Sequence, residues 1–140
     1  MAQVDILVVV DVEGASNSGL QNNVWMLDTG KYLGTQECGN ELVTLVNSAD
    51  IVTWTVQPID PATNVTFGPG QPFSTFQSNP PTIPNIINPQ QNPINTQQFM
   101  GRFSPPGGTQ AGATYQYSIT LSMDGKTQTF DPFLKLYTTT

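Results

Sequence analysis

The chain has 140 residues, with 4 Lys and Arg against 10 Asp and Glu, a formal net charge of −6, and no His. This length suits a single domain with its own core, spanning residues 1–140. The lack of His excludes Ser-His-Asp and Cys-His catalysis and His-ligated zinc, and four cations are too few for nucleic acid to be a partner. The single Cys38 excludes an intramolecular disulfide, and we interpret it as a structural thiol.

The first half of the chain predicts strands joined by loops and one hairpin. Residues 4–13 carry apolar side chains at alternate positions and an apolar middle, which favours a strand buried on both faces at its centre. Small and polar residues at 14–19 indicate a loop, and residues 23–28 indicate a short strand. The β-rich runs 41–46 and 51–57 flank four turn-forming residues, so we expect them to form a hairpin.

Residues 58–96 differ in composition from the rest of the chain. The stretch 58–106 holds 11 of the 12 prolines, and because proline has no N–H, little regular sheet is expected there. Apolar side chains are nevertheless interspersed among the prolines, including Phe73, Phe76, Ile86 and Ile87. We predict a long, ordered, Pro-rich excursion that packs on the domain or on a neighbouring copy, with a floppy insertion as the alternative.

The last third of the chain has the clearest strand pattern. Residues 97–103 resume regular structure, and apolar and polar side chains alternate from 115 to 123. The dipeptide Asp124-Gly125 then predicts the turn of a hairpin. No stretch of ten residues has the pattern of an amphipathic helix. Together these elements predict an all-β fold, an antiparallel β-sandwich of about seven to eight strands.

The longest apolar run and the start of the chain indicate whether the protein spans a membrane or is secreted. Residues 6–10 are far short of the roughly 18 residues that cross a bilayer as a helix, so we expect no membrane span. The start of the chain has the acidic Asp5 and lacks the basic region of a secretory signal. We therefore expect a cytoplasmic protein, with non-classical export as the alternative.

Several stretches together resemble a known family. They are residues 5–11, the strand with Trp54, the Tyr-rich run 115–123, and Gly125-Lys126-Thr127-Gln128 followed by Phe130-Asp131-Pro132. In this combination the chain resembles the bacterial AidA/PixA family of nematocidal or inclusion-body proteins. The resemblance implies a compact β-sandwich made in quantity, at times as crystalline inclusions, with no catalytic residues to carry over. The chain departs from that family in its 58–96 segment and in having only four Met.

Four carboxylates are the candidates for metal or acid–base chemistry. On a strand over 4–13, Asp11 and Glu13 share one face, about 6.6 Å apart along the strand. Such a pair suits glycosidase chemistry, or calcium binding together with Asp28 or Asp131. A solvated strand end explains the same pattern and is the interpretation we favour, so we expect no catalytic residues and no cofactor, with calcium as the alternative.

Aromatic side chains are the candidates for sugar binding. Trp25, Tyr32 and Tyr137 have rings that stack well on sugars when exposed. Trp54 shares a strand face with Val52 and Val56, so we assign it to the core. Trp25 is left open between the core and a carbohydrate-binding surface.

Self-association is the function that the surface composition favours. Sandwich edges invite pairing with other chains, and Lys, the usual guard of such edges, occurs three times in the chain. We therefore expect a non-enzymatic structural homo-oligomer, such as a fibre, coat or inclusion subunit, and as the alternative a carbohydrate- or calcium-binding lectin-like module. The candidate binding residues are Trp25 for sugar, and Phe73, Phe76, Ile86 and Ile87 for a neighbouring copy.

Overall fold

The computed structural model describes residues 2–29, 42–77 and 86–140, with residues 75–77 described by their backbone. Within these residues the chain is mostly β, with one short helix. The elements in chain order are β1 (Gln3–Val10), α1 (Val12–Ser18), β2 (Val24–Asp28), β3 (Val43–Val46), β4 (Ile51–Pro58), β5 (Thr66–Phe67), β6 (Phe73–Gln77), β7 (Gln90–Gln91), β8 (Gln98–Arg102), β9 (Thr114–Met123), β10 (Lys126–Phe130) and β11 (Phe133–Leu136).

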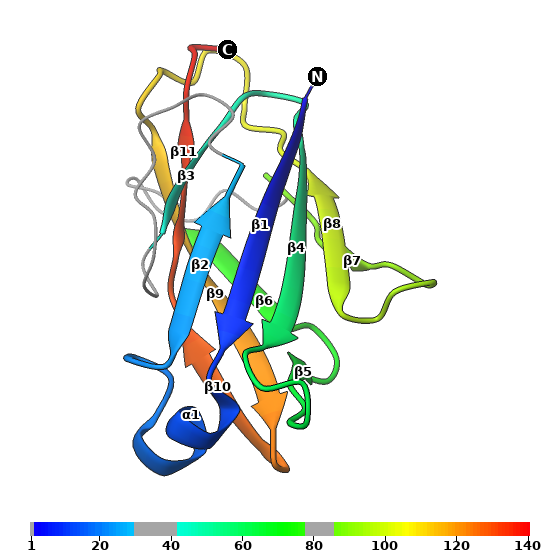
Figure 1. Ribbon diagram of the computed structural model, residues 1–140. Coiled ribbons are helices and arrows are strands. Elements are labelled where there is room, and N and C mark those ends of the chain that lie inside the picture. Colours follow the sequence, from blue (N-terminus) through cyan, green and yellow to red (C-terminus); the bar gives the residue numbers. More distant parts are fainter. Residues whose placement is uncertain (1, 30–41, 78–85) are drawn as a thin grey trace.

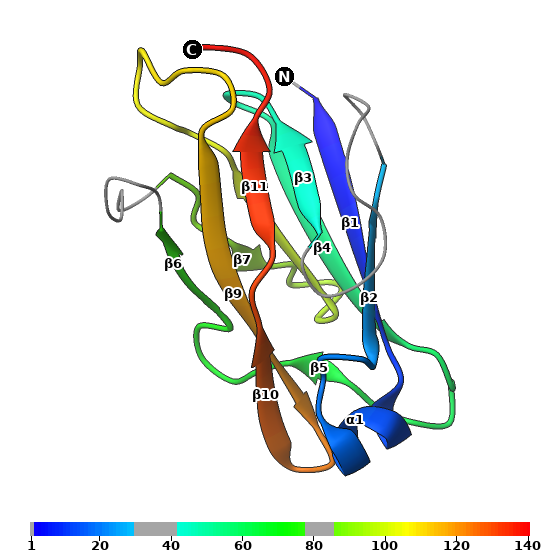
Figure 2. The same ribbon diagram turned by 90° about the vertical axis from the view of Figure 1, so that its left-hand side faces the viewer.

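The strands form two mixed sheets. The five-stranded sheet has the order β2-β1-β4-β8-β7, with β1 antiparallel to β2 and parallel to β4. In the six-stranded sheet β9 pairs with β10, β11, β5 and β6, and β11 pairs in parallel with β3. Figures 1 and 2 together show β9, β10 and β11 as a layer behind β1, β2 and β4. The prediction of all-β structure is confirmed, but the prediction of wholly antiparallel pairing is wrong.

The predicted hairpin between residues 41–46 and 51–57 is also wrong. The four residues between these strands do form a turn, in which Ala49 has a φ of 73° and Asp50 accepts a hydrogen bond from the Asn47 amide. The turn leads from one sheet to the other, so β3 pairs with β11 while β4 pairs with β1 and β8. Two strands on either side of a short turn need not pair when each finds a longer-range partner.

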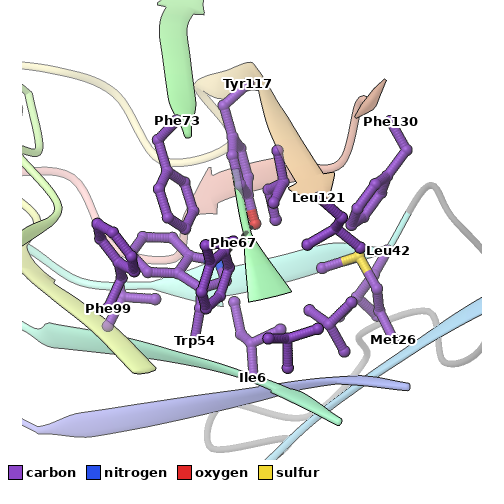
Figure 3. Close-up of a cluster of buried hydrophobic side chains, with 14 of the residues drawn as sticks. Ile6, Met26, Leu42, Trp54, Phe67, Phe73, Phe99, Tyr117, Leu121 and Phe130 are labelled. Atoms are coloured by element: carbon purple, nitrogen blue, oxygen red, sulfur yellow. Dashed lines mark hydrogen bonds between the residues drawn. The ribbon is translucent and has the colours of Figure 1, made fainter. Parts of the chain in front are cut away.

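The core lies between the two sheets. Alternate residues of β1 and β4 point inward from the five-stranded sheet, and the predicted alternation of β9 is confirmed by five buried side chains from Tyr115 to Met123. Rings from both sheets meet there: the centroid of Trp54 is 4.7 Å from that of Phe73 and 5.8 Å from that of Tyr117 (Figure 3). The assignment of Trp54 to the core is confirmed, because its side chain is fully buried.

The first strand is shorter than residues 4–13. It ends at Val10, and the side chain of Asp11 accepts a 3.0 Å hydrogen bond from the Gly14 amide as the N-cap of α1. An N-cap carboxylate satisfies an amide that the first helical turn leaves unpaired, which favours a helix over a continued strand. The loop predicted at 14–19 is therefore mostly the helix α1, which is too short to show an amphipathic period.

The described part of the 58–96 segment packs on its own chain. The strands β5 and β6 pair with β9, and β7 pairs with β8. Ile87 lies against β8 where Gly101 has no side chain, since a Cβ there would be 2.8 Å from Ile87 Cγ1. Phe73, Ile86 and Ile87 are buried in the core of their own chain, which is one of the two alternatives left open for this segment. The side chain of Phe76 lies outside the described part.

Candidate functional site

The outer face of the five-stranded sheet, the face turned away from the core, carries apolar side chains. On β1 the strand period turns Leu7 and Val9 outward, because Ile6 and Val8 between them are buried. The register places Leu27 of β2 beside Leu7 and Trp25 beside Val9. These four side chains form a partly exposed apolar stripe along β1 and β2.

A depression of about 500 Å³ lies on this outer face. Leu7 and Leu27 supply its apolar lining, and Leu27 is 39% exposed. The polar part of the lining comes from four strands: Gln3 and Asp5 on β1, Asp28 at the end of β2, Thr55 on β4 and Gln98 on β8. We call this feature the outer-face depression.

The polar side chains of the outer-face depression are held by one another. Gln3 Nε2 donates to Asp5 Oδ1 at 3.0 Å, and Gln98 Nε2 donates to Thr55 Oγ1 at 3.2 Å. These bonds fix amide and carboxylate groups around an apolar centre before any ligand arrives. An apolar lining with a few fixed polar groups is the usual composition of a protein binding site. This arrangement therefore suits a ligand in which an apolar group is flanked by hydrogen-bonding groups.

The four predicted calcium ligands lie at separate places. Asp11 caps α1 and Glu13 lies exposed in its first turn, so the two carboxylates do not share a strand face as predicted. Asp28 is the last residue of β2, whereas Asp11 lies beside the beginning of that strand. Asp131 accepts a 2.5 Å hydrogen bond from Ser118 Oγ. In the described ranges no three His, Cys, Asp or Glu side chains are grouped so that they could hold a metal ion.

The predicted sugar-stacking residues differ in exposure. Trp25 is half-buried on the outer face, on the same side of β2 as Leu27, so it belongs to the apolar stripe. Tyr137 follows β11 and is 47% exposed. Tyr32 and Cys38 lie outside the described residues.

Two buried polar residues were not among the predicted sites. Asp50 is 1% exposed, and its carboxylate accepts 2.8 Å hydrogen bonds from the amides of Ala2 and Asn47. It therefore ties the beginning of β1 to the turn between β3 and β4. The turn-forming residues 47–50 indicated a turn, but nothing in the local sequence indicated that the chain start would close on it.

The hydroxyl of Tyr117 is a further buried polar group. Burial raises the pKa of Tyr117 well above its ordinary value, the hydrogen bond from Trp54 acts in the opposite direction, and the negative charge of Asp28 raises it further. The side chain therefore stays neutral across the physiological range and acts in the core as a hydrogen-bond partner.

The fold and its outer face define a class: a mixed two-sheet β protein with a preformed depression on one sheet. Within that class the chain belongs to the family described as a domain of unknown function, DUF8788, whose model matches residues 2–129. A sequence comparison with curated proteins gave no match. No helix in the described ranges has the length and apolar character needed to cross a membrane.

A solved structure with a similar fold supports the resemblance that the sequence suggested. The crystal structure of the inclusion body protein PixA from Burkholderia cenocepacia J2315 matches with a TM-score of 0.55, covering 98% of this chain and 94% of that one. The sequence identity is 13%, so the likeness is one of fold. The predicted resemblance to the AidA/PixA family is thereby confirmed at the level of structure.

Proposed function

We propose that this protein is a non-enzymatic structural β-sandwich that works by self-association. The observation that carries the proposal is the fold it shares, over nearly its whole length, with a protein described as an inclusion body protein. An inclusion is a dense assembly of copies, so a subunit needs surfaces that tolerate close approach by its own kind. The surface of this chain has two features of that sort.

The first feature is the composition of the strands that bound the sheets. Among the described residues, β2 and β7 lie at the edges of the five-stranded sheet, and β3 lies at one edge of the six-stranded sheet. None of these three strands carries Lys or Arg. Strand edges without Lys or Arg favour pairing with another chain.

The second feature is the low density of charge. Charged residues make up 10% of the chain, against about 25% in ordinary globular domains. The net charge of −6 still opposes contact between copies at long range. Salt screens this repulsion while leaving contacts between neutral surfaces intact, so association should strengthen as salt is added.

Light scattering coupled to size-exclusion chromatography tests the proposal. We expect masses that are multiples of 15.2 kDa, rising with protein concentration and with salt. A single species of 15.2 kDa at high concentration and high salt would contradict self-association. Electron microscopy of the largest species then distinguishes a fibre from a compact particle.

Carbohydrate binding is the second candidate function, favoured by the half-buried Trp25 in the apolar stripe. A glycan array with and without calcium, repeated with Trp25→Ala, tests it. The expected result is a response that disappears in the variant and survives in Tyr137→Ala, which removes an exposed ring elsewhere. A chain that responds to neither sugar nor calcium is not a lectin-like module.

A further inference from the structure

The connection between β7 and β8 displays one apolar side chain. Figure 1 shows this connection projecting away from the sheets, and Ile94 within it is 94% exposed. Such exposure means that Ile94 packs neither on the core nor on the outer-face depression of its own chain. It is the most exposed large apolar side chain of the described residues.

Hydrogen bonds brace this connection from within. Asn92 Oδ1 accepts from the Ile94 amide at 2.9 Å, and Asn95 Oδ1 accepts from the Gln97 amide at 3.1 Å. Asn92 Nδ2 donates to Gln98 Oε1 at 2.8 Å, and this bond ties the connection to the first residue of β8. The backbone that carries Ile94 is therefore held in place before it meets a partner, and a preorganised contact loses less conformational entropy on binding.

The chemistry of the connection matches that of the outer-face depression. Residues 88–98 contain no charged side chain, although the chain as a whole has a net charge of −6. The depression combines apolar Leu7 and Leu27 with the carboxylate of Asp5, which alternates with the buried Ile6 and so points outward. An uncharged, amide-rich segment brings no acid toward this carboxylate and supplies N–H donors for it, whereas most other parts of an acidic chain would be repelled.

From these observations, and resting on the proposed self-association, we infer that Ile94 of one copy inserts into the outer-face depression of a second copy. The connection lies beyond β7 at one edge of the five-stranded sheet, while Leu7 and Leu27 lie on β1 and β2 toward the other edge. The two contacting surfaces are therefore different parts of the molecule, which makes the interface heterologous. In a pair of copies, one copy still has an unoccupied depression and the other still has an unused connection. Each of these can bind a further copy, so the contact propagates into a chain of subunits.

Two single variants and their mixture test this inference. Ile94→Asp removes the inserting side chain, and Leu27→Lys places a charge in the depression at a partly exposed position. Each variant alone should associate about tenfold more weakly or worse, because a charge replaces an apolar contact at the centre of the interface. Mixed together, they should form a 1:1 dimer of two 15.2 kDa chains that does not grow, since Leu27→Lys supplies an intact connection and Ile94→Asp an intact depression.

Ile59→Asp is the matched control, because it adds the same charge at another exposed isoleucine, 55% exposed, outside both surfaces. It should assemble as the unaltered protein does, and circular dichroism should show all variants folded. Assembly of Ile94→Asp at the level of the unaltered protein would overturn the inference and leave the proposed self-association standing. A mixture that stays monomeric, or an equal loss in Ile59→Asp, would also overturn it. An unaltered protein that never associates would overturn both.

Discussion

The indole Nε1 of Trp54 on β4 donates a 2.9 Å hydrogen bond to the hydroxyl of Tyr117 on β9, across the space between the two sheets. Both side chains are fully buried, and their rings meet edge to face with centroids 5.8 Å apart. Each polar atom thus has a partner in a place that water does not reach. The pair links the two layers at one definite register, because a shift of either strand by one residue would turn its ring out of the core.

Tyr117→Phe should lower the free energy of unfolding by about 1–3 kcal/mol, because it leaves the Trp54 N–H buried without its acceptor. Urea unfolding followed by circular dichroism measures the change. Tyr115→Phe is the matched control, since Tyr115 is buried two residues earlier on the same strand and makes no such bond to Trp54. Equal losses in the two variants would show that the bond contributes nothing specific.

The stability of the protein should fall at alkaline pH. Burial raises the pKa of Tyr117 in the folded state above its ordinary value of 10.0, so the unfolded chain loses this proton first. The contribution is complete below about pH 10 and decreases as the pH rises, by up to about 1.4 kcal/mol for each pH unit. Unfolding titrations above and below about pH 10 measure this slope, and Tyr117→Phe should lack it. The same slope in that variant would assign the effect to other groups.

Asp11→Ala should destabilise the protein by about 1 kcal/mol, because the Gly14 amide loses the side-chain acceptor that caps α1. Thermal unfolding measures the change. Glu13→Ala removes a neighbouring carboxylate that lies exposed and should change stability by less than about 0.5 kcal/mol. If both variants lose the same stability, Asp11 contributes only its negative charge near α1, and its hydrogen bond to the Gly14 amide contributes nothing specific.

Gly101→Ala should destabilise the protein by about 1–3 kcal/mol, because the added Cβ would come within 2.8 Å of Ile87 Cγ1. Gly107→Ala is the matched control, since a Cβ at that position meets no atom within 4 Å. Urea unfolding of both variants checks the prediction. If the Gly101→Ala protein is as stable as the control, Ile87 can move away from β8 without a loss of stability, and the prediction is wrong.

Turn chemistry and strand alternation account for the part of the fold that the sequence predicted. The Asp124-Gly125 turn joins β9 to β10 as expected, with φ values of 50° and 74°, because Asp and Gly tolerate the positive φ that a tight hairpin turn requires. The inward side chains of β9 alternate as predicted because a strand has a period of two residues. These are local properties, so a short window of sequence contains them.

The site was less accessible to prediction than the fold. Trp25 was recognised as ambiguous, and it lies at the boundary between burial and exposure. The outer-face depression joins residues of β1, β2, β4 and β8, and no spacing in the sequence relates Leu7 to Leu27 or Gln98. The apolar residues Phe73 and Ile87 indicated that the Pro-rich segment packs, but not whether on its own domain or on a neighbouring copy, and both lie in the core of their own chain.

The amino-acid sequence by itself determined that strands form at β1 to β4, β8 and β9, where the β9–β10 turn falls, and which side of β4 carries Trp54. Only the tertiary structure decided that β1 pairs in parallel with β4, that β3 leaves β4 for β11, and that Ile94 is displayed at the end of a braced connection. The physical reason is that backbone hydrogen bonds are nearly the same for any pair of strands. The choice of partner therefore depends on how all the apolar faces are buried together, which no single segment specifies.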